Sequence, residues 1–205
     1  MAKLSKLQKF AAIRTFPNVY SSESYDSPRV LDHRGQARLI KGQWNAHFGN
    51  DKPIILEVAC GKGHYARGLA EMYPEYNYIG VELKGNRLYT GAVEFYFEKG
   101  EVEQIWITFP DPQLGKPRKR VTAPRFLQVY RNILAANNQV HLKTDSPDLY
   151  QYTLEILEEA QITPSYQRDD IYAQPLDFPA LAIKTFYEEM HLEDERTIKN
   201  LRFSL

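Results

Sequence analysis

From residue 54 onwards, short apolar runs alternate with segments whose apolar positions recur every three or four residues. The runs at 54–59, 76–83, 104–109 and 139–145 have the length of buried strands, and most are rich in β-branched or aromatic residues. The intervening segments predict helices at 64–73, 123–136 and 146–160. Such alternation predicts an α/β fold in which a mostly parallel sheet is covered by helices on both faces.

The two ends of the chain depart from this alternation. Residues 1–50 predict a basic N-terminal arm followed by a turn-rich stretch without clear periodicity. The final apolar run, 197–203, predicts a strand that joins the edge of the sheet in the antiparallel direction. We therefore expect two parts, an irregular segment at 1–50 and one folded domain at 51–205.

Composition is that of a soluble globular protein, with 43% hydrophobic and 25% charged residues in 205. No apolar run reaches 18 residues and the N-terminus lacks a secretory pattern, so we expect a cytoplasmic protein that does not enter a membrane. The single cysteine, Cys60, cannot form an internal disulfide, and we interpret it as a small residue in a crowded turn. The five histidines are scattered, which argues against a metal site.

The net charge of zero conceals two basic segments. Residues 1–14 hold four bases and no acid, and residues 116–131 hold six bases and no acid. Lysine and arginine gain affinity for phosphates by releasing counterions, so these segments indicate an anionic partner. A solvated surface remains the alternative for either segment alone.

The sequence EVACGKG places a glycine turn between the first strand and the first helix. Gly61 and Gly63 let bare backbone approach a ligand at the helix N-terminus. Glu82 ends the next strand, where an acid can accept hydrogen bonds from both ribose hydroxyls of an adenosine group. Glu57 would repel a pyrophosphate but can accept from the ammonium of an amino acid. This turn predicts S-adenosylmethionine as the cofactor; a tight turn with exposed acids is the alternative.

The stretch IWITFPDP ends a strand in an acid flanked by two prolines. Ligands of an open α/β sheet lie beyond the carboxyl ends of its strands, so we expect Asp111 to face the same crevice as Glu57 and Glu82. The prolines fix φ and stiffen the chain as it leaves the sheet. Asp145 repeats the arrangement on the next strand, although there it could instead cap the following helix.

The motifs EVACGKG, YIGVEL, IWITFPDP with its basic tail, VHLKTD and IKTFYEE follow one another as they do in the bacterial tRNA (guanine-N7)-methyltransferases. Residues 54–205 resemble this TrmB family. The resemblance implies a Rossmann-like class I methyltransferase. It also implies transfer of a methyl group from S-adenosylmethionine to N7 of a guanine in the tRNA variable loop. The sequence leaves open whether the protein is a monomer or a homodimer.

The resemblance also implies roles for individual residues. Three acids match cofactor contacts of the family: Glu57, Glu82 and Asp111. Five residues match its substrate contacts: Lys116, Asp145, Thr185, Tyr187 and Glu188. Guanine N7 carries a lone pair that can attack the methyl group directly, so no general base is required. Asp111, the predicted catalytic residue, or Asp145 would accept hydrogen bonds from the guanine base.

This chain departs from the family pattern in several places, and its N-terminal 50 residues match that pattern only loosely. DPQLGKPRKR replaces DPWPKKRH, so Lys116 lies one position late, and Phe186 replaces an acid in the T-x-Y-E motif. Between Glu82 and Ile105 the chain has room for one helix, whereas the fold normally has a further strand there as well. Either a strand-helix segment is deleted near Ala92, or the sequence omits a stretch. We expect the second, because loss of a strand would expose apolar surface.

Two other hypotheses remain open from the sequence. One is an RNA-binding protein of the same fold with a degenerate cofactor pocket. The other is an S-adenosylmethionine-dependent methyltransferase that acts on another RNA.

Overall fold

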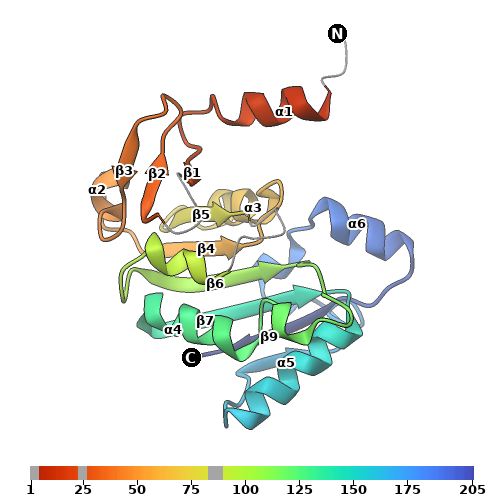
Figure 1. Cartoon of the computed structure of the whole chain (residues 1–205). Coiled ribbons are helices and arrows are strands. Elements are labelled where there is room, and N and C mark those ends of the chain that lie inside the picture. Colours follow the sequence, from red (N-terminus) through yellow and green to blue (C-terminus); the bar gives the residue numbers. More distant parts are fainter. Residues whose placement is uncertain (1–4, 23–26, 83–89) are drawn as a thin grey trace.

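A six-stranded mixed sheet forms the centre of the protein in a computed structural model that describes residues 5–22, 27–82 and 90–205 (Figure 1). The strand order is β5 (Asn77–Val81), β4 (Ile54–Val58), β6 (Val102–Thr108), β7 (Leu134–Thr144), β9 (Lys199–Phe203) and β8 (Tyr166–Arg168). The first four strands pair in parallel, whereas β9 runs antiparallel to both β7 and β8. The predicted α/β class with a mostly parallel sheet is confirmed.

Helices cover both faces of this sheet because alternate residues of each strand point to opposite sides. On one face, Leu56 and Ile105 pack in a core with α4 (Pro124–Ile133) and α5 (Pro147–Glu159). On the other, Ile55 and Trp106 pack with α3 (His64–Met72) and with η3 (Pro179–Ala182). Ser146 caps α5, since its hydroxyl accepts from the Leu149 N–H at 3.2 Å.

The N-terminal segment is more ordered than the sequence pattern indicates. It contains α1 (Lys6–Ile13), an antiparallel sheet of β1 (Ser21–Ser22), β2 (Arg29–Leu31) and β3 (Ala37–Leu39), and α2 (Trp44–Phe48). Trp44 stacks on Phe97 at 5.4 Å between ring centroids and donates to the Tyr96 carbonyl at 2.8 Å. Strands of two or three residues are too short to show periodicity, which is why the sequence did not reveal them. The division at residue 50 stays a prediction.

The C-terminal strand is antiparallel, as predicted, but it does not lie at the sheet edge. β9 pairs on one side with β7 and on the other with β8, which forms the edge instead. The sequence analysis missed β8 because it has three residues. The helix predicted at 123–136 also ends earlier, at Ile133, since β7 begins at Leu134.

Among the described residues, no strand lies beyond β5, where the methyltransferase fold normally has a further one. Our expectation that the sequence omits a stretch near Ala92, rather than carrying a deletion there, stays a prediction. Ala92 lies in a short helix, η1 (Thr90–Phe95), that leads towards β6. Within the described ranges, β5 is the outermost strand on this side of the sheet.

Candidate functional site

The predicted acids lie at the carboxyl ends of four neighbouring parallel strands. Glu57 is in β4, Glu82 follows β5, Asp111 follows β6 and Asp145 follows β7. The parallel register aligns the last residue of β4, Val58, with the ends of β5 and β6. This edge of the sheet is where ligands of open α/β folds bind, so the topology brings the predicted residues to one end of the molecule.

Backbone strain concentrates at the same edge. Ala59, Phe109 and Gln113 adopt positive φ values of 61°, 47° and 48°, which side chains other than glycine rarely adopt. The turn after β6 is held to the sheet because the Phe109 N–H donates to the Lys143 carbonyl at 2.8 Å. Strained conformations cost about 1–3 kcal/mol each and cluster at functional sites. Their position therefore supports this edge as the candidate site.

The glycine turn joins the ends of β4 and β5. The Gly61 N–H donates to Glu82 Oε2 at 2.6 Å, and both Gly61 and Gly63 have positive φ. A Cβ on Gly63 would meet no atom within 4 Å, so glycine is required there for its backbone conformation rather than for space. Gly63 is the residue that immediately precedes α3, and the turn thus presents backbone at that helix's N-terminus.

Glu57 is a buried carboxylate, 1% exposed, at the centre of the site. It accepts hydrogen bonds from the Thr108 hydroxyl at 2.7 Å and from the Ala66 N–H at 2.9 Å. Burial raises the pKa of Glu57 to about 7, although these two hydrogen bonds act in the opposite direction. An acid held this way changes its charge close to neutral pH.

Cys60 lies in the same turn and remains a thiol. Burial, together with the nearby Glu57 and Glu82, raises the pKa of Cys60 to about 12. Its side chain is closely packed, because a Cβ added to Gly80 would lie 2.9 Å from Cys60 Sγ. These contacts support its interpretation as a small residue in a crowded turn.

Asp111 is exposed and stabilises the turn that follows β6. Its Oδ1 accepts from the Gln113 N–H at 2.9 Å, and Lys116 lies exposed at the start of η2 (Pro117–Lys119). Arg120, by contrast, is buried, and it donates to the Pro112 carbonyl at 3.1 Å. The basic segment therefore has one structural member, while Lys116, Arg118, Lys119 and Arg125 are exposed to solvent.

Asp145 does not cap α5, a role that belongs to Ser146. Its side chain is 15% exposed and forms an ion pair with Arg196 at 2.8 Å. His191 Nε2 lies 3.5 Å from its other carboxylate oxygen. Asp145 would have to exchange these partners to contact a bound base.

The T-x-Y-E residues divide into two groups in the structure. Thr185 caps α6 (Phe186–Glu193) by accepting from the Glu188 N–H at 3.1 Å. Glu188 is fully buried and pairs with Lys143 at 2.7 Å, and Tyr172 donates to it at 2.8 Å. Tyr187 is 45% exposed. Two members of the motif thus fix the position of the helix, and only Tyr187 is open to solvent.

Sequence reasoning missed the residues that pair with Asp145 and Glu188, above all Lys143, which pairs with Glu188. Its ammonium also donates to the carbonyls of Leu181 and Ile183, at 2.9 and 3.0 Å. The available signal was a lysine inside the buried strand VHLKTD, since an unpaired charge is not tolerated there. The sequence does not identify its partner, because Glu188 is 45 residues away.

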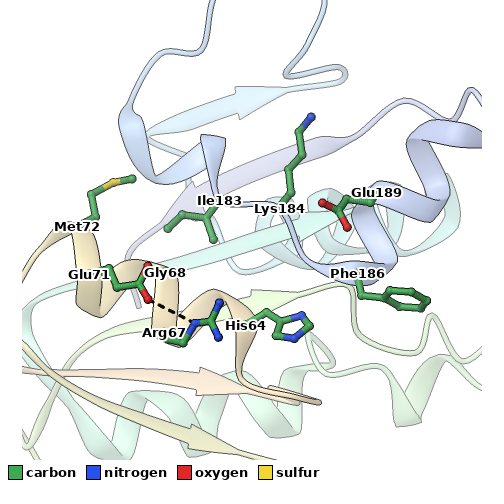
Figure 2. Close-up of a pocket in the computed structure, with 9 residues that line it drawn as sticks. All are labelled: His64, Arg67, Gly68, Glu71, Met72, Ile183, Lys184, Phe186 and Glu189. Atoms are coloured by element: carbon green, nitrogen blue, oxygen red, sulfur yellow. Dashed lines mark ion pairs between the residues drawn. The ribbon is translucent and has the colours of Figure 1, made fainter.

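A groove opens beside this site, between α3 and the start of α6 (Figure 2). Its volume is about 630 Å³, and nine residues line it. Gly68 keeps the two walls close, because a Cβ there would lie 2.6 Å from Ile183 Cγ2.

Neither a metal centre nor a membrane span is found in the part of the chain that the structure describes. No group of three or more histidine, cysteine or acidic side chains is placed there to hold a metal ion. No helix there is both long and apolar enough to cross a membrane.

The chain is similar in sequence to known proteins over nearly its whole length. The family described as "Putative methyltransferase" matches residues 90–201. The tRNA (guanine-N(7)-)-methyltransferase of Bacteroides thetaiotaomicron is 36% identical over 222 residues, covering 98% of this chain and 86% of that protein. The protein of the same name from Porphyromonas gingivalis is 38% identical over 215 residues, covering 94% and 86%. Similarity therefore extends into the N-terminal segment.

A third protein of that name, from Christiangramia forsetii, is 34% identical over 229 residues, covering 100% of both chains. This alignment is longer than the 205 residues of the present chain, so that protein carries residues that this chain lacks. The difference agrees with both hypotheses for the short connection near Ala92, a deletion and an omitted stretch.

Two solved structures have a similar fold. The 16S rRNA methyltransferase KamB superposes with a TM-score of 0.57 at 10% identity, covering 83% of this chain and 96% of that chain. An antibiotic-related methyltransferase gives a TM-score of 0.51 at 16% identity, with the same coverage. At such low identity the likeness concerns the fold alone, which is the Rossmann-like class I fold.

Proposed function

We propose, from the premise that this chain belongs to the tRNA (guanine-N(7)-)-methyltransferase family, that it transfers a methyl group from S-adenosylmethionine to N7 of a guanine in the tRNA variable loop. The observation that carries the proposal is sequence similarity that spans at least 94% of this chain in each of three such relatives. The glycine turn with its two acids, Glu57 and Glu82, supports it as a place for the cofactor.

In the proposed complex, the carboxyl ends of β4 and β5 bind the cofactor. Glu82 accepts from the ribose hydroxyls and already orients the turn through the Gly61 N–H. Glu57 accepts from the ammonium of the methionine part, which its buried position makes a strong interaction. Gly63 lets backbone N–H groups approach the ligand closely.

The guanine would lie at the ends of β6 and β7. Bound S-adenosylmethionine supplies an electrophilic methyl group, whose bond to sulfur breaks as the bond to N7 forms. Asp111, and Asp145 once it exchanges its partners Arg196 and His191, would accept from the base N–H groups, which selects guanine over adenine. Positioning of this kind can account for about 7–11 kcal/mol of the barrier in well-oriented reactions. Because the target lies in folded RNA, the base has to turn outwards into the site.

With tRNA as its substrate, the protein is proposed to act in the cytoplasm. The exposed bases after β6 are proposed to contact tRNA phosphates. Lys116 would take the place of the family lysine. A monomer and a homodimer are both compatible with this arrangement.

A methyl-transfer assay tests the function. The purified protein and labelled S-adenosylmethionine should label unmodified tRNA, and nucleoside analysis should find N7-methylguanosine. Label in another nucleoside, or a requirement for ribosomal RNA, would overturn the proposed substrate. Failure to bind S-adenosylhomocysteine in calorimetry would instead favour an RNA-binding protein with a degenerate pocket.

The phosphate contacts lead to a prediction about salt. The double variant Arg118→Ala/Lys119→Ala should raise the KM for tRNA, and the salt dependence of binding, log Kd against log salt, should fall by about 1.5, because each phosphate contact contributes about 0.7–0.9. Filter binding at several salt concentrations measures this slope. A matched control is Lys52→Ala/Lys99→Ala, which removes two exposed charges near the amino ends of β4 and β6. Equal slopes for the two variants would contradict the prediction.

A further inference from the structure

The groove between α3 and α6 has the dimensions of a ligand site, but none of its nine lining residues belongs to the proposed cofactor or guanine contacts. Its volume of about 630 Å³ falls within the range of roughly 300–1,000 Å³ common for small-ligand sites. His64 and Phe186 lie where the two helices begin, and Ile183 and Lys184 lie in the segment that leads into α6 (Figure 2). The remaining lining residues lie on α3, apart from Glu189 on α6. His64 directly follows the glycine turn, so the groove begins next to that turn.

Phe186 provides an exposed aromatic surface at the mouth of the groove. Its side chain is 51% exposed, although a phenylalanine at the start of a helix would normally be expected to pack inwards. The Lys62 ammonium lies 4.7 Å from the ring centroid, and Lys62 is not among the residues that line the groove. A cation thus lies over one face of the ring, and the ring still presents an exposed aromatic surface.

Exposed apolar side chains gather around the same groove. Among the described residues, eight large apolar side chains are exposed, and four of them lie on α3 or α6: Met72, Phe186, Tyr187 and Met190. Tyr187 packs edge-to-face with Phe186 at 5.7 Å between ring centroids. A cluster of exposed apolar side chains is typical of an interaction surface or a ligand-binding groove.

The charges in the groove balance one another. Each wall carries one base and one acid: Arg67 forms an ion pair with Glu71 at 3.4 Å on α3, and Lys184 and Glu189 lie on the opposite wall. A groove without net charge is a poor phosphate site, but it offers both donors and acceptors beside an aromatic ring. These are the features that bind an unstacked nucleobase, whose faces stack and whose edges form hydrogen bonds.

We propose that this groove holds an unstacked base of the RNA next to the target guanine, stacked on the ring of Phe186. The inference rests on the proposed function, since it takes RNA as the substrate. Turning a guanine out of folded RNA disrupts the stacking of its neighbours, and Phe186 replaces the stacking partner that a neighbouring base loses. The substitution of an acid by phenylalanine in the T-x-Y-E motif then gives this chain an RNA contact of its own.

The experiment compares variants of Phe186 in full-length protein. Phe186→Ala should lower kcat/KM for tRNA by roughly tenfold to a hundredfold, as expected for loss of one stacked base, mainly through KM. Phe186→Trp should retain activity and Phe186→Leu should not, because leucine is apolar but cannot stack. Affinity for S-adenosylhomocysteine and the melting temperature should be unchanged. Leu39→Ala, which truncates an exposed apolar residue of β3 outside the groove, is the matched control.

A direct readout uses 2-aminopurine in place of a base beside the target guanine. Its fluorescence should be quenched when the RNA binds the wild-type protein and should stay high with Phe186→Ala. Full activity of Phe186→Leu, or fluorescence that does not depend on residue 186, would overturn the inference. So would a change from dimer to monomer in Phe186→Ala, which would make the groove an interface between two copies. Methylation of unaltered tRNA by the wild type tests the proposed function separately.

Discussion

Replacement of Glu57 by glutamine should weaken the binding of S-adenosylmethionine by roughly tenfold to a hundredfold. Glutamine keeps the shape of the side chain and can still accept one hydrogen bond, but it removes the negative charge that we propose pairs with the ligand ammonium. A hydrogen bond to a charged group contributes about 1.5–3 kcal/mol, which corresponds to this loss of affinity. Isothermal calorimetry measures it directly.

The same residue should make binding depend on pH. The pKa of Glu57 is raised to about 7, and only its ionised form attracts an ammonium. Affinity should therefore fall by up to about tenfold for each pH unit below 7 and level off above it. In Glu57→Gln this dependence should disappear. Glu71→Gln, which alters an exposed carboxylate of α3, is the matched control.

The stability of the ligand-free protein should respond to Glu57 in the opposite direction. The folded state holds this proton up to about pH 7, whereas an unfolded glutamate releases it near its ordinary pKa of 4.5. Between these values the folded state binds more protons, so the contribution of Glu57 to stability is present below pH 4.5 and is lost as the pH rises through 7.

The proposed pairing of Glu57 with the ligand ammonium would be refuted by a pH-independent affinity in the wild type together with unaltered binding by Glu57→Gln.

Replacement of Lys143 by methionine should destabilise the fold by about 3–5 kcal/mol, the usual effect of breaking a buried ion pair. The change leaves Glu188 buried without its cation, and the carbonyls of Leu181 and Ile183 lose their donor. Burial lowers the pKa of Lys143, and Glu188 counteracts this effect. Urea denaturation followed by circular dichroism gives the free energy of unfolding.

A double variant distinguishes the effect of the ion pair on stability from the effect of side-chain packing. Lys143→Met/Glu188→Leu should recover much of the lost stability, because no uncompensated charge remains. The surface pair Arg67–Glu71 serves as a control, since Arg67→Met should change stability by less than about 1 kcal/mol. A loss below 1 kcal/mol for Lys143→Met, or a double variant no more stable than the single one, would show that the pair does not hold α6 on the sheet.

The sequence predicted the parts of the fold that depend on local patterns. Apolar runs identified β4 to β7, and the rule that ligands lie at carboxyl ends of parallel strands brought Glu57, Glu82 and Asp111 to one edge. Contacts between distant segments were not predictable. Nothing in the sequence pairs Lys143 with Glu188, or distinguishes the buried Arg120 from its exposed basic neighbours.

The short connection between β5 and β6 illustrates a different limit of prediction from the sequence. Loss of a sheet strand was expected to expose too much apolar surface, and so the sequence analysis favoured an omitted stretch. In the structure the shortened connection contributes Val93 and Phe97 to the main core, where both side chains are buried. The sequence pattern did not predict that residues of this connection pack into the core.

The crowded position of Cys60 has a chemical consequence for an enzyme that handles an alkylating agent. A sulfonium methyl donor reacts with soft nucleophiles, and the thiolate is the nucleophilic form of cysteine. The same burial and acidic neighbours that raise the pKa of Cys60 to about 12 keep its sulfur protonated. The chain's single sulfhydryl can thus lie in the cofactor turn without being methylated itself, and the methyl donor then reacts with the RNA.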